Sequence, residues 1–297
     1  MTPRILALVP TISRTRALAA APWLRALRAA GIDVRIVANA ASVASAAADL
    51  DAPVIDTGAN PGFARSILAA IATVDEWDWV VLLNDDLIFR AEAASHLQNA
   101  IDGAADRSNG PDELLYFDPE PPRSLPGRWG VFLSLSLLEA LSARFVRRHR
   151  IARGGHGGYK SFSAVAIHRR AWTRAGGLDG RLIFCFEDAL FVRNHRIRGG
   201  AEPVSIDVGI SHEKSTTTSR HIARVLPAVA FSARTYLEVL GTPVRFANAI
   251  VLAALIVRLP LVVFASAPPR AHLRGIVDAA RAVASGREPS LPSYELL

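Results

Sequence analysis

The chain has 297 residues, of which 51% are hydrophobic and 21% charged, and this balance excludes a disordered protein and indicates a globular one. The formal net charge of +7 is carried almost entirely by arginine, which suits phosphates, nucleic acid or anionic lipid and does not choose among them. The sequence has no zinc-ligand spacing, RNA-binding aromatic signature or recognisable helix-turn-helix, so we expect no nucleic-acid partner. The single cysteine, Cys185, excludes an internal disulfide, and its apolar neighbours favour a buried side chain over a nucleophile.

The first half of the chain alternates strand-like and helix-like segments. Short apolar runs predict strands at residues 5–9, 34–37, 53–56 and 79–83. Helical spacing is found at residues 17–30, which end at Gly31, and at about 62–74. Continuous apolar strands separated by helices indicate an α/β fold with a mostly parallel central sheet covered on both faces.

Polar clusters follow three of these strands, at residues 11–14, 39–42 and 84–86. Ligands of parallel α/β sheets bind at the carboxyl ends of the strands. The convergence of the three clusters at one edge of the sheet therefore predicts a ligand site there.

The second half of the chain is less regular. Proline and acidic residues at 107–126 indicate an irregular connection, and the glycine-rich stretch 154–158 predicts a mobile loop near the site. Beyond them we expect a strand at 162–168, a helix from about Arg170, a turn at Gly176-Gly177 and a strand-like run at 204–210.

From about residue 217 to residue 286 the pattern is helical, and residues 216–297 contain nine arginines against four acids. The most apolar stretch, Ala249 to Phe264, is interrupted by Arg258 and Pro260 and is too short for a transmembrane helix. Two interpretations remain: the helices only pack on the rest of the chain, or they attach it to an anionic cytoplasmic membrane face. The arginine cluster from Arg144 to Arg153 would assist attachment or form a solvated helix face.

Asp85 and Asp86 come directly after the apolar strand 79–83. Adjacent carboxylates repel each other and are costly at a buried strand end without a cation. Hard oxygen ligands suit Mg²⁺ or Mn²⁺ bridging to a diphosphate. The alternative is a solvated turn in which Asn84 and Asp85 bond their own backbone.

Glu187 and Asp188 lie inside an apolar run, where a carboxylate with a raised pKa can act as a general base. The alternative is a helix N-cap or a buried ion pair with Arg193 or Arg196. His212 follows the strand-like run 204–210 among polar residues, which suggests a loop able to reach phosphates, although a lone histidine is more often structural.

The order of these motifs resembles the family 2 glycosyltransferases of the GT-A fold, especially their rhamnosyltransferase-like bacterial members. The resemblance covers residues 3–215, and six motifs carry it. They are Leu8-Val9-Pro10-Thr11 with Arg14, Asn60-Pro61-Gly62-Phe63-Ala64, Val81-Leu82-Leu83-Asn84-Asp85-Asp86, Ile167-His168-Arg169-Arg170 with Gly176-Gly177-Leu178-Asp179, Phe186-Glu187-Asp188 with Arg193, and Ile210-Ser211-His212.

The resemblance implies an inverting sugar transfer from a nucleoside-diphosphate sugar. Asp86 with Asp85 would hold the metal on the donor diphosphate, and His212 would approach the same metal or the phosphates. Asp188 would deprotonate the acceptor hydroxyl, and Glu187 would position the acceptor. The residues implied on the nucleotide and donor side are Pro10, Thr11, Arg14, Asn39, Asn60, Gly62, Phe63, Ala64 and Asn84.

One departure from the family concerns the nucleobase. Ala38 stands where the family has an aspartate that contacts the base, so Asn39 or Ser42 would make an altered contact. The resemblance leaves deoxythymidine-diphosphate-rhamnose and uridine-diphosphate sugars as donors, with a glycan or lipid-linked acceptor of the cell surface.

The predicted organisation is a GT-A domain at residues 1–215, with a donor half at 1–106 and an acceptor half at 107–215, followed by a basic helical region at 216–297. The N-terminal apolar run is too short for a signal peptide, so we expect a cytoplasmic location, free or peripheral on the inner face of the plasma membrane. A nucleotidyltransferase is a second hypothesis, although Pro10 to Arg14 lack the glycine and lysine of a phosphate loop. A non-catalytic membrane-associated binding protein of the same fold is a third.

Overall fold

The computed structural model describes residues 2–50, 52–105, 113–139, 158–212, 221–265 and 267–292. Its centre is a seven-stranded sheet in the order β10-β6-β9-β4-β1-β2-β3. The strands are β1 (Ile5–Thr11), β2 (Asp33–Ala38), β3 (Val54–Asp56), β4 (Trp79–Leu83), β6 (Leu114–Tyr116), β9 (Ala164–His168) and β10 (Val204–Ser205). Neighbouring strands pair in parallel except for β9, which is antiparallel to both β4 and β6. The expected mostly parallel α/β sheet is therefore confirmed.

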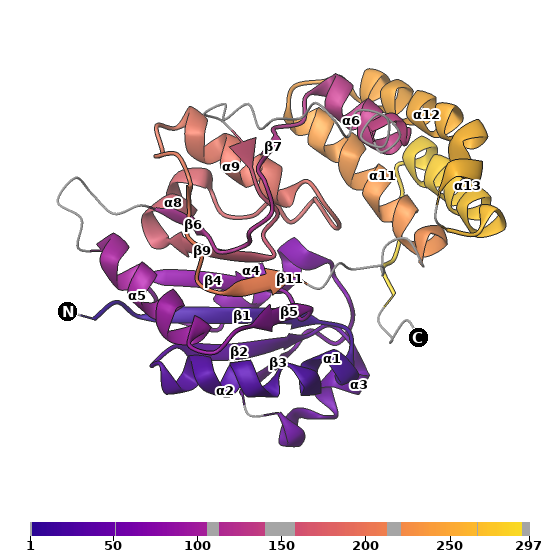
Figure 1. The fold of residues 1–297 in the computed structure, drawn as a ribbon. Coiled ribbons are helices and arrows are strands. Elements are labelled where there is room, and N and C mark those ends of the chain that lie inside the picture. Colours follow the sequence, from indigo (N-terminus) through magenta and orange to yellow (C-terminus); the bar gives the residue numbers. More distant parts are fainter. Residues whose placement is uncertain are drawn as a thin grey trace.

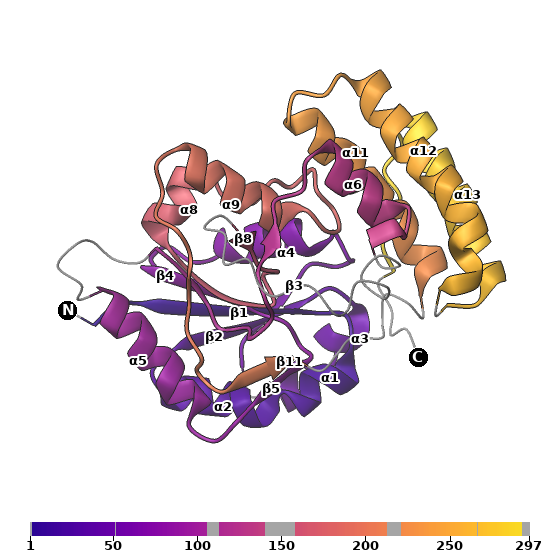
Figure 2. The same cartoon turned by 45° about the horizontal axis from the view of Figure 1, so that its top comes forward.

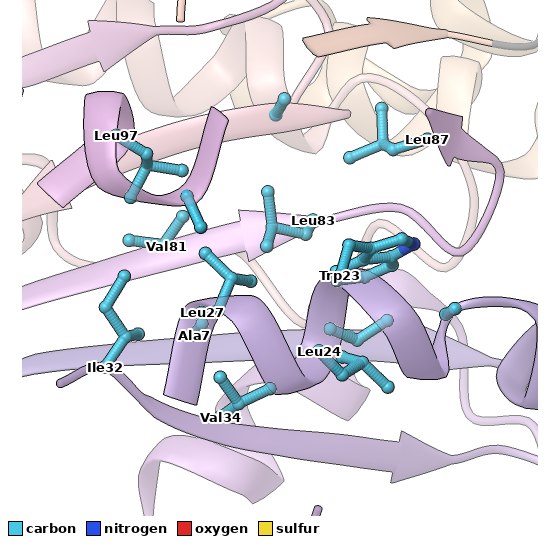
Figure 3. Close-up of a cluster of buried hydrophobic side chains, with 14 of the residues drawn as sticks. Ala7, Trp23, Leu24, Leu27, Ile32, Val34, Val81, Leu83, Leu87 and Leu97 are labelled. Carbon is cyan, nitrogen blue, oxygen red and sulfur yellow. The ribbon is translucent and has the colours of Figure 1, made fainter. Parts of the chain in front are cut away.

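Helices cover both faces of this sheet (Figure 1). They are α1 (Arg14–Ala19), α2 (Ala21–Ala29), α3 (Ala41–Ala44), α4 (Phe63–Ile71), α5 (Ala93–Ala105), α8 (Arg169–Ala175) and α9 (Glu187–Ile197), with the 3₁₀ turn η1 (Ala47–Asp49). On one face Leu24 and Leu27 of α2 pack over Ala7, Val34 and Val81 of three strands (Figure 3). On the other face α4, α8 and α9 pack against the alternate strand residues. Strands buried on both faces explain the continuous apolar runs in the sequence.

Two small antiparallel ribbons lie beside the main sheet. One pairs β5 (Leu87–Phe89) with β11 (Ile210–His212), and the other pairs β7 (Arg123–Ser124) with β8 (Gly158–Tyr159). The first ribbon joins the segment after β4 to a segment far along the chain, which matters for the site.

The C-terminal helices form a separate cluster with one helix from the middle of the chain (Figures 1 and 2). This cluster contains α6 (Arg128–Leu135), α11 (Ile222–Val239), α12 (Val244–Leu261), η2 (Val262–Phe264) and α13 (Pro269–Ser285). Leu182, Ala189 and Leu190 share its core, so the cluster is packed onto α9. The predicted domain boundary at residue 215 lies outside the described residues.

Several expectations about local structure were wrong. The helix expected at 17–30 is two helices, because Pro22, which lacks an N–H, cannot continue α1 and lies in the first turn of α2. The run 204–210 is not one strand, because a turn in which Gly209 N donates to Asp207 Oδ1 separates β10 from β11. The segment 107–126 contains both β6 and β7, and Cys185 is exposed instead of buried. The glycine-rich stretch up to Gly157 and the Arg144–Arg153 cluster lie outside the described residues.

Candidate functional site

Asn84, Asp85 and Asp86 form the link between β4 and β5. Every residue of β4 is buried, and Asn84 N donates to Ser163 O at 2.8 Å, which fixes the point where the strand leaves the sheet. The polar link therefore lies at the carboxyl edge of the sheet, as predicted.

Asp86 is paired with His212. The β5–β11 ribbon sets Leu87 opposite His212, and this register brings His212 Nε2 to 3.0 Å from Asp86 Oδ1. The Asp86 carboxylate raises the pKa of His212 above its ordinary value, against the effect of burial. Two residues singled out from the sequence are thus brought into contact by a strand pairing that joins distant parts of the chain.

Asp85 faces the turn after β1. Thr11 Oγ1 donates to Asp85 Oδ2 at 2.5 Å, and an Arg16 guanidinium nitrogen lies 3.3 Å from Asp85 Oδ1 and 3.8 Å from Asp86 Oδ2. Burial raises the pKa of Asp85, while the Thr11 and Arg16 contacts oppose the rise. Arg16, which sequence reasoning missed, is the cation between the carboxylates, whereas Arg14 pairs with the exposed Asp49 at 3.2 Å.

The carboxylates have the chemistry of a divalent-cation site. Asp86 Oδ1 is buried, and no described donor reaches it with hydrogen-bond geometry, although His212 is near. Within the described residues no group of three or more histidine, cysteine or acidic side chains is arranged to hold a metal. Two protein ligands nevertheless fit Mg²⁺, which is commonly held by one or two carboxylates together with substrate phosphates and water.

Asp118 is a further carboxylate at the same edge, after β6. Its Oδ2 accepts from Ser163 Oγ at 2.5 Å, and its backbone oxygen accepts from Lys160 Nζ at 2.7 Å. The Asp118 charge helps to raise the pKa of His212, so the two groups are near each other. The only sequence signal for Asp118 was an acidic residue after the short apolar run 114–117, which the proline-rich context concealed.

Glu187 and Asp188 are the first two residues of α9. Burial raises the pKa of both carboxyls, and their mutual repulsion adds to the rise for Glu187. Ala189 N donates to Asp188 Oδ1 at 2.6 Å, and Glu187 Oε2 is buried without a hydrogen bond. Neither residue is the N-cap, which is Phe186.

The backbone before this pair is unusual. Cys185 and Phe186 both have positive φ angles, of 68° and 70°, which side-chain-bearing residues rarely adopt. Such conformations cost about 1–3 kcal/mol each and cluster at functional sites. The alternative ion pair with Arg196 is disfavoured, because Arg196 contacts Glu202 and Gly158 O, each at 2.7 Å.

The predicted donor turn lies against the loop that leads to Glu187 and Asp188. Gly62, which precedes α4, has φ 94°, and a Cβ atom there would lie 2.1 Å from Ile183 O. Asn60 Oδ1 accepts from Gly62 N at 3.1 Å, and Asn60 Nδ2 donates to Pro292 O at 2.7 Å. Phe63 is half-buried and Ala64 is buried, so the turn is fixed on several sides.

The side chain of Asn39 is hydrogen-bonded inside the protein. It is buried, and its Oδ1 accepts from Thr57 Oγ1 at 2.9 Å and from Ser66 Oγ at 2.8 Å. Ala38, where the resembled family has an acid, is fully buried, and Pro10 is half-buried at the end of β1. A contact of Asn39 or Ser42 with a nucleobase stays a prediction.

Comparison with known families gives one match. The model of the MobA-like NTP transferase domain matches residues 16–152, which is less than half of the chain. A search of curated proteins finds no match.

Among solved structures, the chain is similar to S. aureus TarS 1-349 in complex with UDP, with 12% identity, a TM-score of 0.46, and coverage of 96% of this chain and 92% of that chain. The complex of TarS 1-349 with UDP-GlcNAc gives 11% identity, a TM-score of 0.44, and coverage of 95% and 92%. The catalytic domain of Drosophila beta1,4galactosyltransferase 7 with xylobiose gives 14% identity, a TM-score of 0.38, and coverage of 71% of each chain. These likenesses are weak, so the site of this chain is interpreted from its own residues.

Proposed function

We propose that this protein is an inverting glycosyltransferase that moves a sugar from a nucleoside-diphosphate sugar to an acceptor hydroxyl. The observation that carries the proposal is the pairing of Asp86 with His212 at the carboxyl edge of a parallel sheet. It is supported by a second carboxylate pair, Glu187 and Asp188, whose preceding loop contacts the donor turn at Gly62. One site would hold the diphosphate, and the other would handle the acceptor proton.

In the proposed reaction the acceptor oxygen bonds to the anomeric carbon while the bond from that carbon to the diphosphate oxygen breaks. The electron pair leaves with the nucleoside diphosphate, and the acceptor proton passes to a carboxylate oxygen of Asp188. The hydrogen bond from Ala189 N holds one Asp188 oxygen, which leaves the other free to accept the proton. Because Asp188 is half-buried, an acceptor can reach it.

Glu187 would have a different role from its neighbour. Two adjacent carboxyls, one of them buried, do not both ionise readily, and the pKa of Glu187 is raised by burial and by the Asp188 charge. A protonated Glu187 can donate a hydrogen bond to the acceptor and so position it. Asp188 then keeps its charge for the proton transfer.

The donor diphosphate would bind beside Asp85, Asp86 and His212. A Mg²⁺ or Mn²⁺ ion held by Asp86 and the phosphates would neutralise charge on the leaving group. Arg16 lies within 4 Å of both aspartates, so its guanidinium is placed to approach the same phosphates. Thr11 fixes Asp85 in this arrangement.

The proposed substrates follow from the resemblance to rhamnosyltransferase-like enzymes. The donor would be deoxythymidine-diphosphate-rhamnose or a uridine-diphosphate sugar, and the acceptor a glycan or lipid-linked hydroxyl used in bacterial cell-surface polysaccharide synthesis. The protein would act in the cytoplasm or on the inner face of the plasma membrane. A thermal-shift screen of nucleoside diphosphates with Mn²⁺ tests which base the altered Ala38 position accepts.

The decisive experiment measures transfer or hydrolysis of nucleotide sugars with Mn²⁺ in the wild type, Asp86→Ala and Asp188→Asn. We expect Asp86→Ala to lose binding of the nucleoside diphosphate and Asp188→Asn to lose turnover while it still binds. A wild type that binds no nucleoside diphosphate in the presence of metal contradicts the proposal. Normal turnover of Asp188→Asn contradicts the role of Asp188 alone.

A nucleotidyltransferase is the second candidate, because a MobA-like NTP transferase model matches residues 16–152. It would transfer the nucleoside monophosphate of a nucleoside triphosphate to the phosphate of an acceptor and release pyrophosphate. Pro10 to Arg14, at the end of β1 and the start of α1, lack glycine and lysine, and the Thr11 side chain donates to Asp85. Pyrophosphate release from triphosphates, without turnover of any nucleotide sugar, would favour this candidate.

A further inference from the structure

The outward face of α12 and η2, from Phe246 to Phe264, exposes apolar side chains, whereas the charged side chain of this segment is buried. The exposed large side chains from Phe246 to Phe264 are Phe246, Ile256, Leu259, Val263 and Phe264, and all are apolar. The one charged residue in that span is Arg258, and it is buried. A helix of a globular protein normally exposes charge and buries apolar groups, so this outward face is suited to an apolar environment.

Arg258 shows that the inward face of α12 is firmly packed. Its guanidinium donates to Leu135 O at 2.7 Å and to His272 Nε2 at 3.0 and 2.8 Å. These contacts join α12 to α6 and α13, so the helix cannot leave the cluster without exposing a buried cation. Among the described helices, Val244–Phe264 alone is long and apolar enough to span a membrane, and 33% of it is buried in the cluster. Its packing favours a helix that lies along a membrane surface over one that crosses it.

The border of this face is basic and aromatic. Apart from the buried Arg258, residues 244–285 contain four arginines and one acid, Asp278. Arg274 and Arg281 of α13 are 81% and 76% exposed and share Asp278 as an ion-pair partner, at 3.8 and 3.2 Å, which leaves a net positive charge. Leu273 and Val277 of the same helix are exposed as well. These groups add positive charge next to the apolar surface, as in peripheral membrane helices.

An exposed tryptophan lies at the other end of the face. Trp129 of α6 is 76% exposed, and its neighbour Arg128 donates to Thr242 Oγ1 at 3.1 Å, directly before α12. Tryptophan is enriched where a protein meets the headgroup region of a bilayer. In both views the helices of this cluster lie at the outer edge of the molecule, away from the central sheet (Figures 1 and 2).

We propose that the face formed by Phe246, Ile256, Leu259, Val263 and Phe264 docks onto an anionic lipid surface, with the arginines of α13 contacting the headgroups. The apolar side chains would enter the outer part of the acyl region, and Arg258 would stay inside the protein. For a lipid-linked acceptor this inference rests on the proposed function, since docking would bring the site to the bilayer that carries the acceptor.

The test is co-sedimentation of the full chain with vesicles of phosphatidylcholine, alone or mixed with phosphatidylglycerol. We expect sedimentation with the anionic vesicles only, and weakening as salt rises. Ile256→Ser with Val263→Ser should weaken binding by about thirtyfold or more, because the two substitutions together remove about 2 kcal/mol or more of apolar burial. Arg270→Gln with Arg274→Gln should weaken it by about fivefold per arginine.

Matched controls exist on other helices. Ile197 of α9 is 66% exposed against 65% for Ile256, so Ile197→Ser changes the same side chain at the same exposure and should bind vesicles normally. Arg170→Gln on α8 is the control for charge. Equal binding by Ile256→Ser with Val263→Ser and by the wild type overturns the proposal. The proposal is also overturned if the wild type binds no vesicles but forms a dimer that the same variant dissociates. A second copy of the chain would then cover the face. The assay requires no nucleotide, so failure of docking is distinguishable from failure of the proposed function.

Discussion

His212 Nε2 lies 3.0 Å from Asp86 Oδ1, although more than a hundred residues separate the two in the sequence. The β5–β11 ribbon causes this contact, because its register aligns His212 with Leu87, the residue that follows Asp86. The ribbon is short and lies outside the main sheet. Leu87 and Ile210 of the ribbon are also buried in the core, so the site is anchored to the packed interior.

The first prediction concerns the pH dependence of turnover. Burial raises the pKa of Asp188 above the ordinary range of an aspartate, and a general base works only when deprotonated. The rate should therefore fall as the pH drops through a weakly acidic range, above the range where an exposed aspartate titrates. Asp188→Asn should lower turnover by about 10²–10⁴-fold and remove the fall in rate at acidic pH. Glu202→Gln, at an exposed ion pair, serves as the control. If Asp188→Asn still shows the same fall in rate at acidic pH, another group causes that fall.

The second prediction separates Arg16 from Arg14. Arg16→Met should destabilise the free protein by about 1–3 kcal/mol, because Asp85 and Asp86 lose the cation between them. Arg14→Met should change the free energy of unfolding by no more than about 1 kcal/mol, since its partner Asp49 is exposed. Urea unfolding measures both, and equal effects would show that Arg16 does not compensate the aspartates.

The third prediction compares two glycines with positive φ angles. In Gly62→Ala the new Cβ meets Ile183 O, so the backbone must shift, whereas Gly58→Ala meets nothing within 4 Å. Gly58→Ala should cost about 1–2 kcal/mol for the left-handed conformation alone. Gly62→Ala should cost about 1–3 kcal/mol more because of the clash. Similar melting temperatures for the two variants would mean that the loop at Ile183 yields easily.

The fourth prediction concerns stability in acid. Burial and the Arg258 charge lower the pKa of His272 to about 4, against about 6.5 in the unfolded chain. The unfolded state therefore binds more protons between these values, so this contribution is complete above about pH 6.5 and is lost as the pH falls toward 4. The loss should be at most about 3 kcal/mol.

His272→Gln can still accept a hydrogen bond from Arg258 but does not titrate, so its unfolding free energy should depend less on pH than that of the wild type. His96→Gln, at an exposed position on α5, should leave the wild-type slope unchanged. Chemical unfolding at pH 7.5 and pH 5 measures the slopes. Parallel slopes for wild type and His272→Gln would exclude His272 as the source.

Much of the fold was predictable because strands buried on both faces are written as continuous apolar runs. The strand before Asn84 follows from such a run, and the helix after Gly62 follows from the helical spacing of its apolar residues. Asp118 could not be found in this way, because β6 has only three residues and follows a polar, proline-containing segment.

The pairing of distant segments was the other limit. Nothing local in the sequence specifies that β11 pairs with β5. Nor does it specify that Arg16, and not Arg14, lies on the side of α1 that faces Asp85. Asp85, Asp86, Glu187, Asp188 and His212 were chosen from their chemistry and from a family resemblance. Their catalytic and metal-binding roles stay predictions.

The contact between Gly62 and Ile183 has a kinetic consequence. Gly62 directly precedes α4, and Ile183 lies in the loop that leads to both carboxylates at the start of α9, with no space for a side chain between them. A ligand that pushes one segment toward the other must therefore displace both. Substitutions in either segment are therefore expected to change KM and kcat together. We also expect the KM for the acceptor at saturating donor to differ from the KM measured at low donor concentration.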